Sequence, residues 1–377
     1  MGPTFLKLPD MAEHPSILVA GAGPTGLTAA VELARLGHRP RIVDRNEGPT
    51  PLSKAVGISA HSLELLEPSG VTGRLLAEGL RIPRGHVHAG GRELGTIRFS
   101  DLPHRFNFLL ALPQSDTETI LAEVLAGFGV TVERRTTLAG LRQAGGRVEV
   151  VLEGPGGREE APFDTVYGAD GVGSRVRESL GVAFEGYDHA RDWSIADAEL
   201  ADWPYEEDTA NLFLQPGGEV GFIIPIGPGR FRAISNTSDA LARIPGGYRV
   251  ARLLRSDRFH IQVRQATTYQ SGRVFLGGDA AHVHSPVGGR GMNLGIEDAC
   301  AFARRFTADD REQALDGYTA ERHPAGQRWI AASERALAAV EASNPFAVAL
   351  RNLAIRAVGR LTSLQRPLLR RAAGLDG

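Results

Sequence analysis

The sequence predicts an α/β fold in which a parallel sheet with flanking helices carries an inserted antiparallel sheet. Two observations predict the parallel part: a strand–helix–strand pattern over residues 16–44, and short apolar runs at residues 166–169 and 273–277. Strands that are buried on both faces read as unbroken apolar runs of this kind. The third observation is the segment 186–269, where short alternating strands are broken by Pro-Gly turns, as is typical of an antiparallel sheet.

The size and composition of the chain exclude several classes of protein. Its 377 residues suggest two or three domains. A formal charge of -2 argues against a nucleic-acid-binding surface, which needs a basic field. The single cysteine, Cys300, excludes an intramolecular disulfide and a cysteine-cluster metal site, and it fits a reducing, cytoplasmic location. We expect neither a signal peptide nor a transmembrane segment, since no apolar run reaches the ~18 residues that a span needs.

The strand–helix–strand unit at the start of the chain is the best defined local pattern. Residues 16–20 are an apolar run, residues 21–26 a glycine-rich turn, and residues 27–36 carry apolar side chains at helical spacing. Residues 41–43 then predict a second strand, which ends at Asp44. The same reasoning predicts helices over residues 117–128 and 293–306, and strands over residues 130–132, 147–152, 166–169 and 273–277.

The glycine-rich turn matches the dinucleotide-binding pattern G-x-G-x-x-G. Gly21 allows the tight turn, Gly23 lets the backbone approach a pyrophosphate, and Gly26 allows close packing of helix and strand. The free N–H groups of the helix that follows would bind the pyrophosphate. Asp44, at the end of the next strand, can accept both hydroxyls of an adenosine ribose. This pattern alone does not choose between FAD and NAD.

Two later motifs choose FAD. Residues 167–177 read YGADGVGSRVR, and residues 273–299 contain RVFLGGDAAH followed by PVGGRGMNLGIEDA. In these motifs the chain resembles the flavoprotein aromatic hydroxylases of the para-hydroxybenzoate hydroxylase type, the group A flavoprotein monooxygenases, from Ile17 to about Arg328. The resemblance implies a Rossmann-like FAD-binding domain of the GR2 type with an inserted substrate domain. We assign the FAD-binding domain to residues 14–81, 108–185 and 270–340, the substrate domain to 82–107 and 186–269, and a C-terminal helical segment to 341–377.

The resemblance also implies which residues hold the cofactor. A short carboxylate at Asp279 would bind a ribityl hydroxyl, and the helix that opens after Gly288 would direct free N–H groups at the flavin. Lys54 and Gln114 stand where the family has a basic residue and a glutamine that touch FAD. The predicted cofactor-binding residues are Gly21, Gly23, Pro24, Thr25, Gly26, Asp44, Arg45, Lys54, Gln114, Asp170, Gly278, Asp279, Pro286, Gly289, Gly291, Met292 and Asn293.

The expected reaction follows from the resemblance as well. NAD(P)H would reduce the flavin, oxygen would form a flavin C4a-hydroperoxide, and an aromatic or polyketide-like molecule, as in secondary metabolism, would be hydroxylated. The flavin carries the chemistry, so the only candidate catalytic side chains are Pro286, His282 and Arg290. Candidate substrate-binding residues are Asn211, Phe213, Phe222, Ile224 and Pro286, although the phenylalanines can equally be ordinary core. A monomer or a homodimer fits the sequence.

Several residues allow two interpretations. Arg290 replaces the glutamine that is usual in the family, and it either adds positive charge near the flavin or points to solvent. His282 and His284 could suggest a metal, but we expect no metal and assign His282 to a hydrogen bond near the cofactor. Glu297 and Asp298 are expected in the first turns of a helix. The segment 351–371 carries six arginines and no acid; we expect it to pack on the body, with a membrane-surface helix as the alternative.

Other functions remain open on the same scaffold. Baeyer–Villiger oxidation, epoxidation and double-bond reduction use related folds. A flavin-bound protein that sequesters its ligand without turnover, and a plain NAD-dependent dehydrogenase, are further alternatives. The complete loop at residues 288–293 argues against sequestration.

Overall fold

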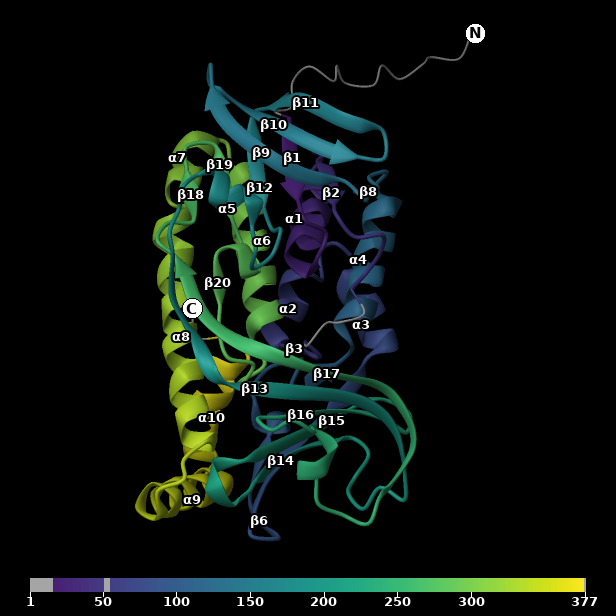
Figure 1. The fold of residues 1–377 in the computed structure, drawn as a ribbon, viewed down its shortest axis with the longest axis vertical. Coiled ribbons are helices and arrows are strands. Elements are labelled where there is room, and N and C mark those ends of the chain that lie inside the picture. The colour runs from purple at the N-terminus through teal and green to yellow at the C-terminus, as the bar shows by residue number, and fades with distance from the viewer. Residues whose placement is uncertain (1–15, 51–54, 376–377) are drawn as a thin grey trace.

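A computed structural model describes residues 16–50 and 55–375 and confirms the predicted α/β class (Figure 1). One sheet has six strands in the order β18-β19-β12-β1-β2-β8. Five of them run parallel, and β18 pairs antiparallel with β19. The bounds are β1 Ile17–Ala20, β2 Arg41–Asp44, β8 Val132–Arg134, β12 Thr165–Gly168, β18 Gln270–Ser271 and β19 Val274–Leu276. The strands β1, β12 and β19 are buried throughout, as their apolar sequences predict.

The parallel register brings the predicted cofactor motifs to one edge of this sheet. Ala20 pairs with Gly168 and with Val43, and Gly168 pairs with Leu276, so these strands end at the same level. In parallel α/β sheets ligands bind outside the carboxyl ends of the strands. Each motif follows one of these strand ends, and segments distant in the sequence therefore meet at one edge.

Three helices cover this sheet and start close to the expected positions. They are α1 Pro24–Arg35, α4 Gln114–Gly127 and α6 Gly291–Phe306, and α1 contacts both of the others. Helix α1 begins at Pro24, where a fixed φ suits the first helical position, rather than at residue 27. Helix α4 begins at Gln114 because Pro113 occupies its N-cap, and α6 begins two residues before Asn293.

The second large sheet has eight strands in the order β20-β17-β13-β16-β15-β14-β5-β6. It lies in the lower half of Figure 1, where β13 and β17 form two long arrows. All neighbours pair antiparallel except β14 and β5. The bounds are β5 Arg84–Ala89, β6 Arg92–Arg98, β13 Phe184–Ala201, β14 Thr209–Leu214, β15 Val220–Gly227, β16 Arg230–Ser235, β17 Arg249–Ala266 and β20 His282–Val283.

Smaller elements complete the body. One three-stranded sheet contains β9 Thr137–Ala144, β10 Arg147–Gly154 and β11 Gly157–Phe163, and a second contains β3 Gly57–Ile58, β7 Leu109–Ala111 and β4 Leu80–Ile82. The shorter helices are α2 Ala60–Leu65, α3 Val71–Glu78, α5 Arg175–Ser179 and α7 Arg311–Asp316.

The C-terminal part forms three helices, α8 Tyr318–Val340, α9 Pro345–Arg360 and α10 Thr362–Ala372. Helix α9 packs closely on β6: a Cβ added at Gly359 would lie 2.8 Å from the Cα of Gly95. The segment therefore packs on the body through α9 and α10. Within residues 351–371, the side chains of Leu353, Leu361, Leu364 and Leu368 stay exposed. Within the described residues, no helix combines the length and apolar character that a membrane crossing requires.

Candidate functional site

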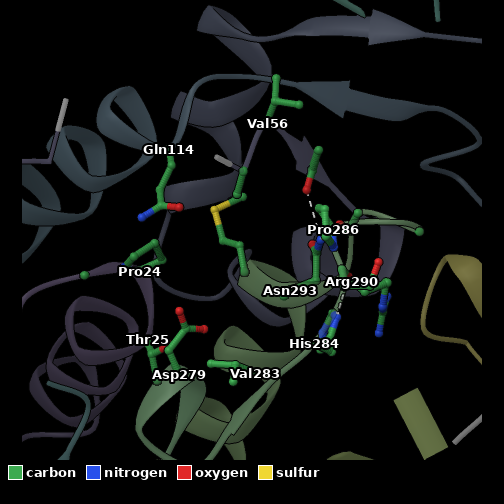
Figure 2. A pocket seen from close by; sticks show the side chains of 18 of the residues that line it. Pro24, Thr25, Val56, Gln114, Asp279, Val283, His284, Pro286, Arg290 and Asn293 are labelled. Atoms are coloured by element: carbon green, nitrogen blue, oxygen red, sulfur yellow. Dashed lines mark hydrogen bonds between the residues drawn. The ribbon is translucent and has the colours of Figure 1, made fainter. Parts of the chain in front are cut away.

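A cavity of about 850 Å³ lies between the carboxyl edge of the six-stranded sheet and the inner face of the eight-stranded sheet. That volume falls in the range of small-molecule and cofactor sites. Figure 2 shows Pro24, Thr25 and Asp279 along one side of it and Pro286, Asn293 and Arg290 along another. The cavity borders the glycine turn, the motif at Asp170 and the loop before α6, so three distant segments meet around it.

The three glycines of the turn have different environments. Gly21 has φ +101°, and a Cβ there would lie 2.2 Å from the carbonyl oxygen of Ala169. A Cβ at Gly26 would lie 1.9 Å from the oxygen of Gly21, so both positions require glycine for packing within the protein. At Gly23 no protein atom lies within 4 Å of the Cβ position, and this residue borders the cavity. The space beside Gly23 and the N-terminus of α1 fit a pyrophosphate.

Asp44 is held rigidly at the end of β2. One carboxylate oxygen accepts the N–H of Ala22 at 2.6 Å, and the other accepts the N–H of Asn46 at 2.7 Å. Each oxygen keeps a further lone pair, so the carboxylate can still accept ribose hydroxyls. Arg45, Gln114 and Arg134 border the same part of the cavity.

Gln114 belongs to a small hydrogen-bond network centred on Glu118. Its side-chain amide donates to Glu118 at 2.8 Å, and Glu118 also accepts the N–H of Thr50 at 3.0 Å. Burial raises the pKa of Glu118. Glu118 thus orients Gln114 at the cavity edge. Lys54 lies outside the described residues.

Asp170 and Asp279 both border the cavity, but in different ways. Asp170 accepts from the Ser174 hydroxyl and from the N–H of Val176 at 3.2 Å, and burial raises its pKa. It therefore orders the start of α5 as well as lining the cavity. Asp279 is exposed on the 3-10 turn Gly278–Ala280. Gly278 itself packs against Thr25, where a Cβ would lie 2.3 Å from the Thr25 hydroxyl, and it does not line the cavity.

We predict that Asp279→Ala weakens FAD binding without unfolding the protein. A hydrogen bond to a charged group is worth about 1.5–3 kcal/mol, which corresponds to roughly ten- to a hundredfold in affinity. Flavin fluorescence during titration of the apoprotein measures the dissociation constant. Asp316→Ala, at an exposed site on α7 away from the cavity, is the control. Equal affinities for both variants would exclude the ribityl role.

The loop before α6 is anchored by Asn293. Its side-chain oxygen accepts the N–H of Ser59 and the hydroxyl of Ser62, both at 2.8 Å, and its amide donates to the carbonyls of Gly57 and Gly289. Asn293 is fully buried, so it fixes the loop from behind. Pro286, Gly289, Gly291 and Met292 border the cavity beside it. The N-terminus of α6 is thereby directed at the cavity, where a helix end favours negative charge.

The acids of α6 form a buried charge network, and the expectation for Glu297 and Asp298 is wrong. They lie in the middle of α6, not in its first turns. Arg322 donates to Asp298 at 2.7 Å and to Glu297 at 3.3 Å. His282 contacts Asp298 at 2.6 Å, is 1% exposed and does not line the cavity. Burial alone would raise the pKa of Asp298, but Arg322 and His282 lower it below its usual value. Both acids thus find their cationic partner, Arg322, on α8.

Arg290 does not point to solvent, since it is 2% exposed. Its guanidinium pairs with Glu297 and lies 4.5 Å from the ring centroid of Trp329 on α8. The interpretation that it points to solvent is therefore wrong. Arg290 borders the cavity, and the interpretation of positive charge near the flavin left out Glu297, the partner acid two turns along the same helix, which balances that charge.

His284 is a cavity residue that sequence reasoning did not select as a binding group. Its Nδ1 donates to the carbonyl of Ser285 at 2.8 Å, which leaves Nε2 as an acceptor. Burial lowers its pKa to about 4, so the ring is neutral at pH 7. Within residues 16–50 and 55–375, no three metal-ligating side chains gather together.

The inner face of the eight-stranded sheet forms the apolar wall of the cavity. Phe222 and Ile224 of β15 border the cavity, as the sequence predicted. Leu212 of β14, which was not predicted, borders it too. Asn211 and Phe213 do not: Asn211 bonds to His88 at 2.9 Å, and Phe213 packs in a separate core behind the sheet. Side chains alternate along a strand, so the residues before and after Leu212 face away. The prediction for β14 was one position out of register.

The comparisons with known proteins agree with this geometry. The family model described as "FAD binding domain" matches residues 15–240 and 248–333. The chain is 35% identical to 6-methylpretetramide 4-monooxygenase of Streptomyces rimosus, over 98% of this chain and 70% of that protein. It is 32% identical to pentachlorophenol 4-monooxygenase of Sphingobium chlorophenolicum, over 86% of this chain and 65% of that protein.

Solved structures show the same fold. An anhydrotetracycline hydroxylase from Streptomyces rimosus superposes with a TM-score of 0.80 at 29% identity, covering 96% of this chain and 76% of the other. The chain spans 65–70% of the length of the two curated relatives above.

Proposed function

The chain belongs to the FAD binding domain family of flavin-dependent monooxygenases, and from this premise we propose that it hydroxylates a bulky aromatic or polyketide-like small molecule. NAD(P)H and molecular oxygen would be its co-substrates. The observation that carries the proposal is that one and the same cavity is bordered both by the glycine turn and by an apolar sheet face. A cofactor and a hydrophobic substrate can meet only in such a shared space.

The residues around the cavity fit FAD in distinct ways. The open space at Gly23 and the N-terminus of α1 would hold the pyrophosphate, Asp44 the ribose, and Asp279 a ribityl hydroxyl. The N-terminus of α6 would stabilise negative charge on a reduced flavin. When bound, FAD supplies hydride acceptance from NAD(P)H and the activation of oxygen.

The protein's own contribution is positioning and exclusion of water. Asn293 fixes the loop against α2, and the neutral His284 adds no charge beside it. Phe222, Ile224 and Leu212 would place the substrate ring and keep the site dry. We propose that the six-stranded sheet and its helices form the cofactor domain, and that the eight-stranded sheet forms the substrate domain.

The same change, phenylalanine to alanine, should have different effects at two positions on the neighbouring strands β15 and β14. Phe222→Ala removes a cavity wall and is expected to raise the KM for substrate about tenfold or more. Phe213→Ala removes a side chain from the core behind the sheet, so it should lower the free energy of unfolding by about 3–5 kcal/mol with an unchanged KM. Steady-state kinetics and urea unfolding separate the two. A raised KM for Phe213→Ala alone would reverse the assigned faces.

The function is tested by oxygen incorporation. We expect that one or more compounds from a panel of phenols and polycyclic aromatics stimulate NAD(P)H oxidation by the FAD-loaded protein. In ¹⁸O₂ the product should carry one labelled oxygen. Ligand binding without stimulated oxidation anywhere in the panel would instead favour a sequestering protein. A product with oxygen inserted beside a carbonyl would indicate Baeyer–Villiger oxidation.

A further inference from the structure

The C-terminal helix α10 forms part of the cavity wall. Leu368, Leu369 and Ala372 border the cavity, and so does Gln365 one turn earlier. Leu369 and Gln365 are buried, whereas Leu368 is 51% exposed, which places this helix where the cavity meets the surface. A wall at this position decides the size of ligand that fits, provided that the helix is held in place.

The first turn of α10 is held against a sheet edge. The side-chain oxygen of Gln365 accepts the N–H of Arg98 at 3.0 Å, and its amide donates to the carbonyl of Thr96 at 2.9 Å. Gln365 thus pairs with the free edge of β6 as another strand would. This anchor involves only the start of the helix.

The last turn of α10 is held by Arg290. A helix leaves its last four carbonyls without partners, and its C-terminus carries partial negative charge. Arg290 donates to the carbonyl of Ala372 at 3.2 Å, and the N–H of His61 donates to that of Ala373. Gly374, just beyond, has φ +78°, and a Cβ there would lie 2.6 Å from the guanidinium. In Figure 2 the yellow C-terminal ribbon lies on the Arg290 side of the cavity.

Arg290 is also the N-cap residue of α6 and adjoins the loop that faces the flavin site. Its planar guanidinium contacts three elements at once: Glu297 on α6, Trp329 on α8 and Ala372 on α10. A lysine has one ammonium and cannot reproduce this fork of donors. The same side chain therefore links the start of α6 to the wall of the cavity, while Asn293 holds the loop itself.

We propose that Arg290 is a positioning residue that seats α10 against the cavity, so that Leu368, Leu369 and Ala372 form a fixed wall that sets which substrates bind. The claim that this wall selects substrates rests on the proposed function, whereas the seating of α10 by Arg290 does not depend on it. Arg290 acts through α10 and not on the flavin, because its charge is already paired with Glu297.

Three variants of the FAD-loaded protein test the proposal. Arg290→Gln and Arg290→Lys remove the fork of donors, and Gly374→Ala displaces the guanidinium from the α10 side while the charge of Arg290 is kept. Arg304→Gln, at an exposed arginine of the same helix α6, is the control. The readouts are amide hydrogen exchange over residues 362–372, the FAD dissociation constant, and KM and kcat.

We expect exchange in α10 to accelerate about tenfold or more in Arg290→Gln and Gly374→Ala, while α4 and the control stay unchanged. KM should rise about tenfold with kcat and FAD affinity within about twofold of the wild type. Unchanged exchange in both variants would overturn the seating role. FAD affinity that falls in parallel with KM would overturn the claim that Arg290 acts through α10.

The two proposals fail in distinguishable ways. If the wild-type protein oxidised no compound, the proposed function would fail, and the hydrogen exchange of α10 would still decide the role of Arg290. If the wild type were active and α10 exchanged equally in all variants, only the positioning role would be wrong.

Discussion

Gly23→Val is expected to abolish FAD retention while leaving the fold intact. Apart from the two adjoining residues, no protein atom lies within 4 Å of the Cβ position, so a valine side chain starts in open space beside the cavity. There it occupies the space that a pyrophosphate needs for close approach to the backbone. The purified variant should be colourless, with a circular dichroism spectrum like that of the wild type.

The control for this experiment is Gly73→Val. Gly73 lies on the exposed side of α3, outside the cavity, and also has no protein atom within 4 Å of its Cβ position. We expect this variant to bind one FAD per chain. A yellow, stoichiometric Gly23→Val protein would mean that the pyrophosphate does not pass over this turn.

Arg322→Met is expected to destabilise the protein severely. Arg322 is the cation that Asp298 and Glu297 share inside the body, at 2.7 Å and 3.3 Å. Asp298 is fully buried, so removal of the Arg322 guanidinium leaves its carboxylate with hydrogen bonds to His282 and the N–H of Gly278. Breaking a buried pair by removing one member costs about 3–5 kcal/mol. Urea unfolding of the apoprotein, followed by tryptophan fluorescence, measures the loss.

Arg304→Met is the matched control, because Arg304 on α6 is exposed and pairs with Glu321 at the surface. Such pairs contribute about 1 kcal/mol or less. Equal stability of Arg322→Met and Arg304→Met would show that the buried network carries little energy.

Lowering the pH should also weaken the wild type. The pKa of Asp298 is depressed in the fold, so the stabilising effect of its carboxylate is lost as pH falls below about 4.

Local patterns predicted the cofactor half of the fold well, for physical reasons. The turn at residues 21–26 and the strands beside it depend on nearest neighbours: buried strands need unbroken apolar runs, and tight turns need glycine. Strands β5 and β6 pair with each other locally, but β5 also pairs with β14, which lies far along the chain. Which strands pair is decided by the tertiary fold, and no short stretch of sequence contains that information.

The misplaced residues have related causes. The choice of Asn211 and Phe213 over Leu212 was an error of register, and one residue of slip reverses the face of every side chain. Arg290, Glu297 and Asp298 looked like separate features of one loop and one helix. Their roles depend on Arg322 of α8 and on the end of α10, which reach them only through the folded chain.

The visible absorption spectrum of the purified wild-type protein tests the central claim most directly. If the cavity between the two sheets is an FAD site, the protein should show a flavin spectrum with one FAD per chain, or acquire it on incubation with FAD. A folded protein that stays colourless and takes up no flavin at saturating FAD would contradict the account.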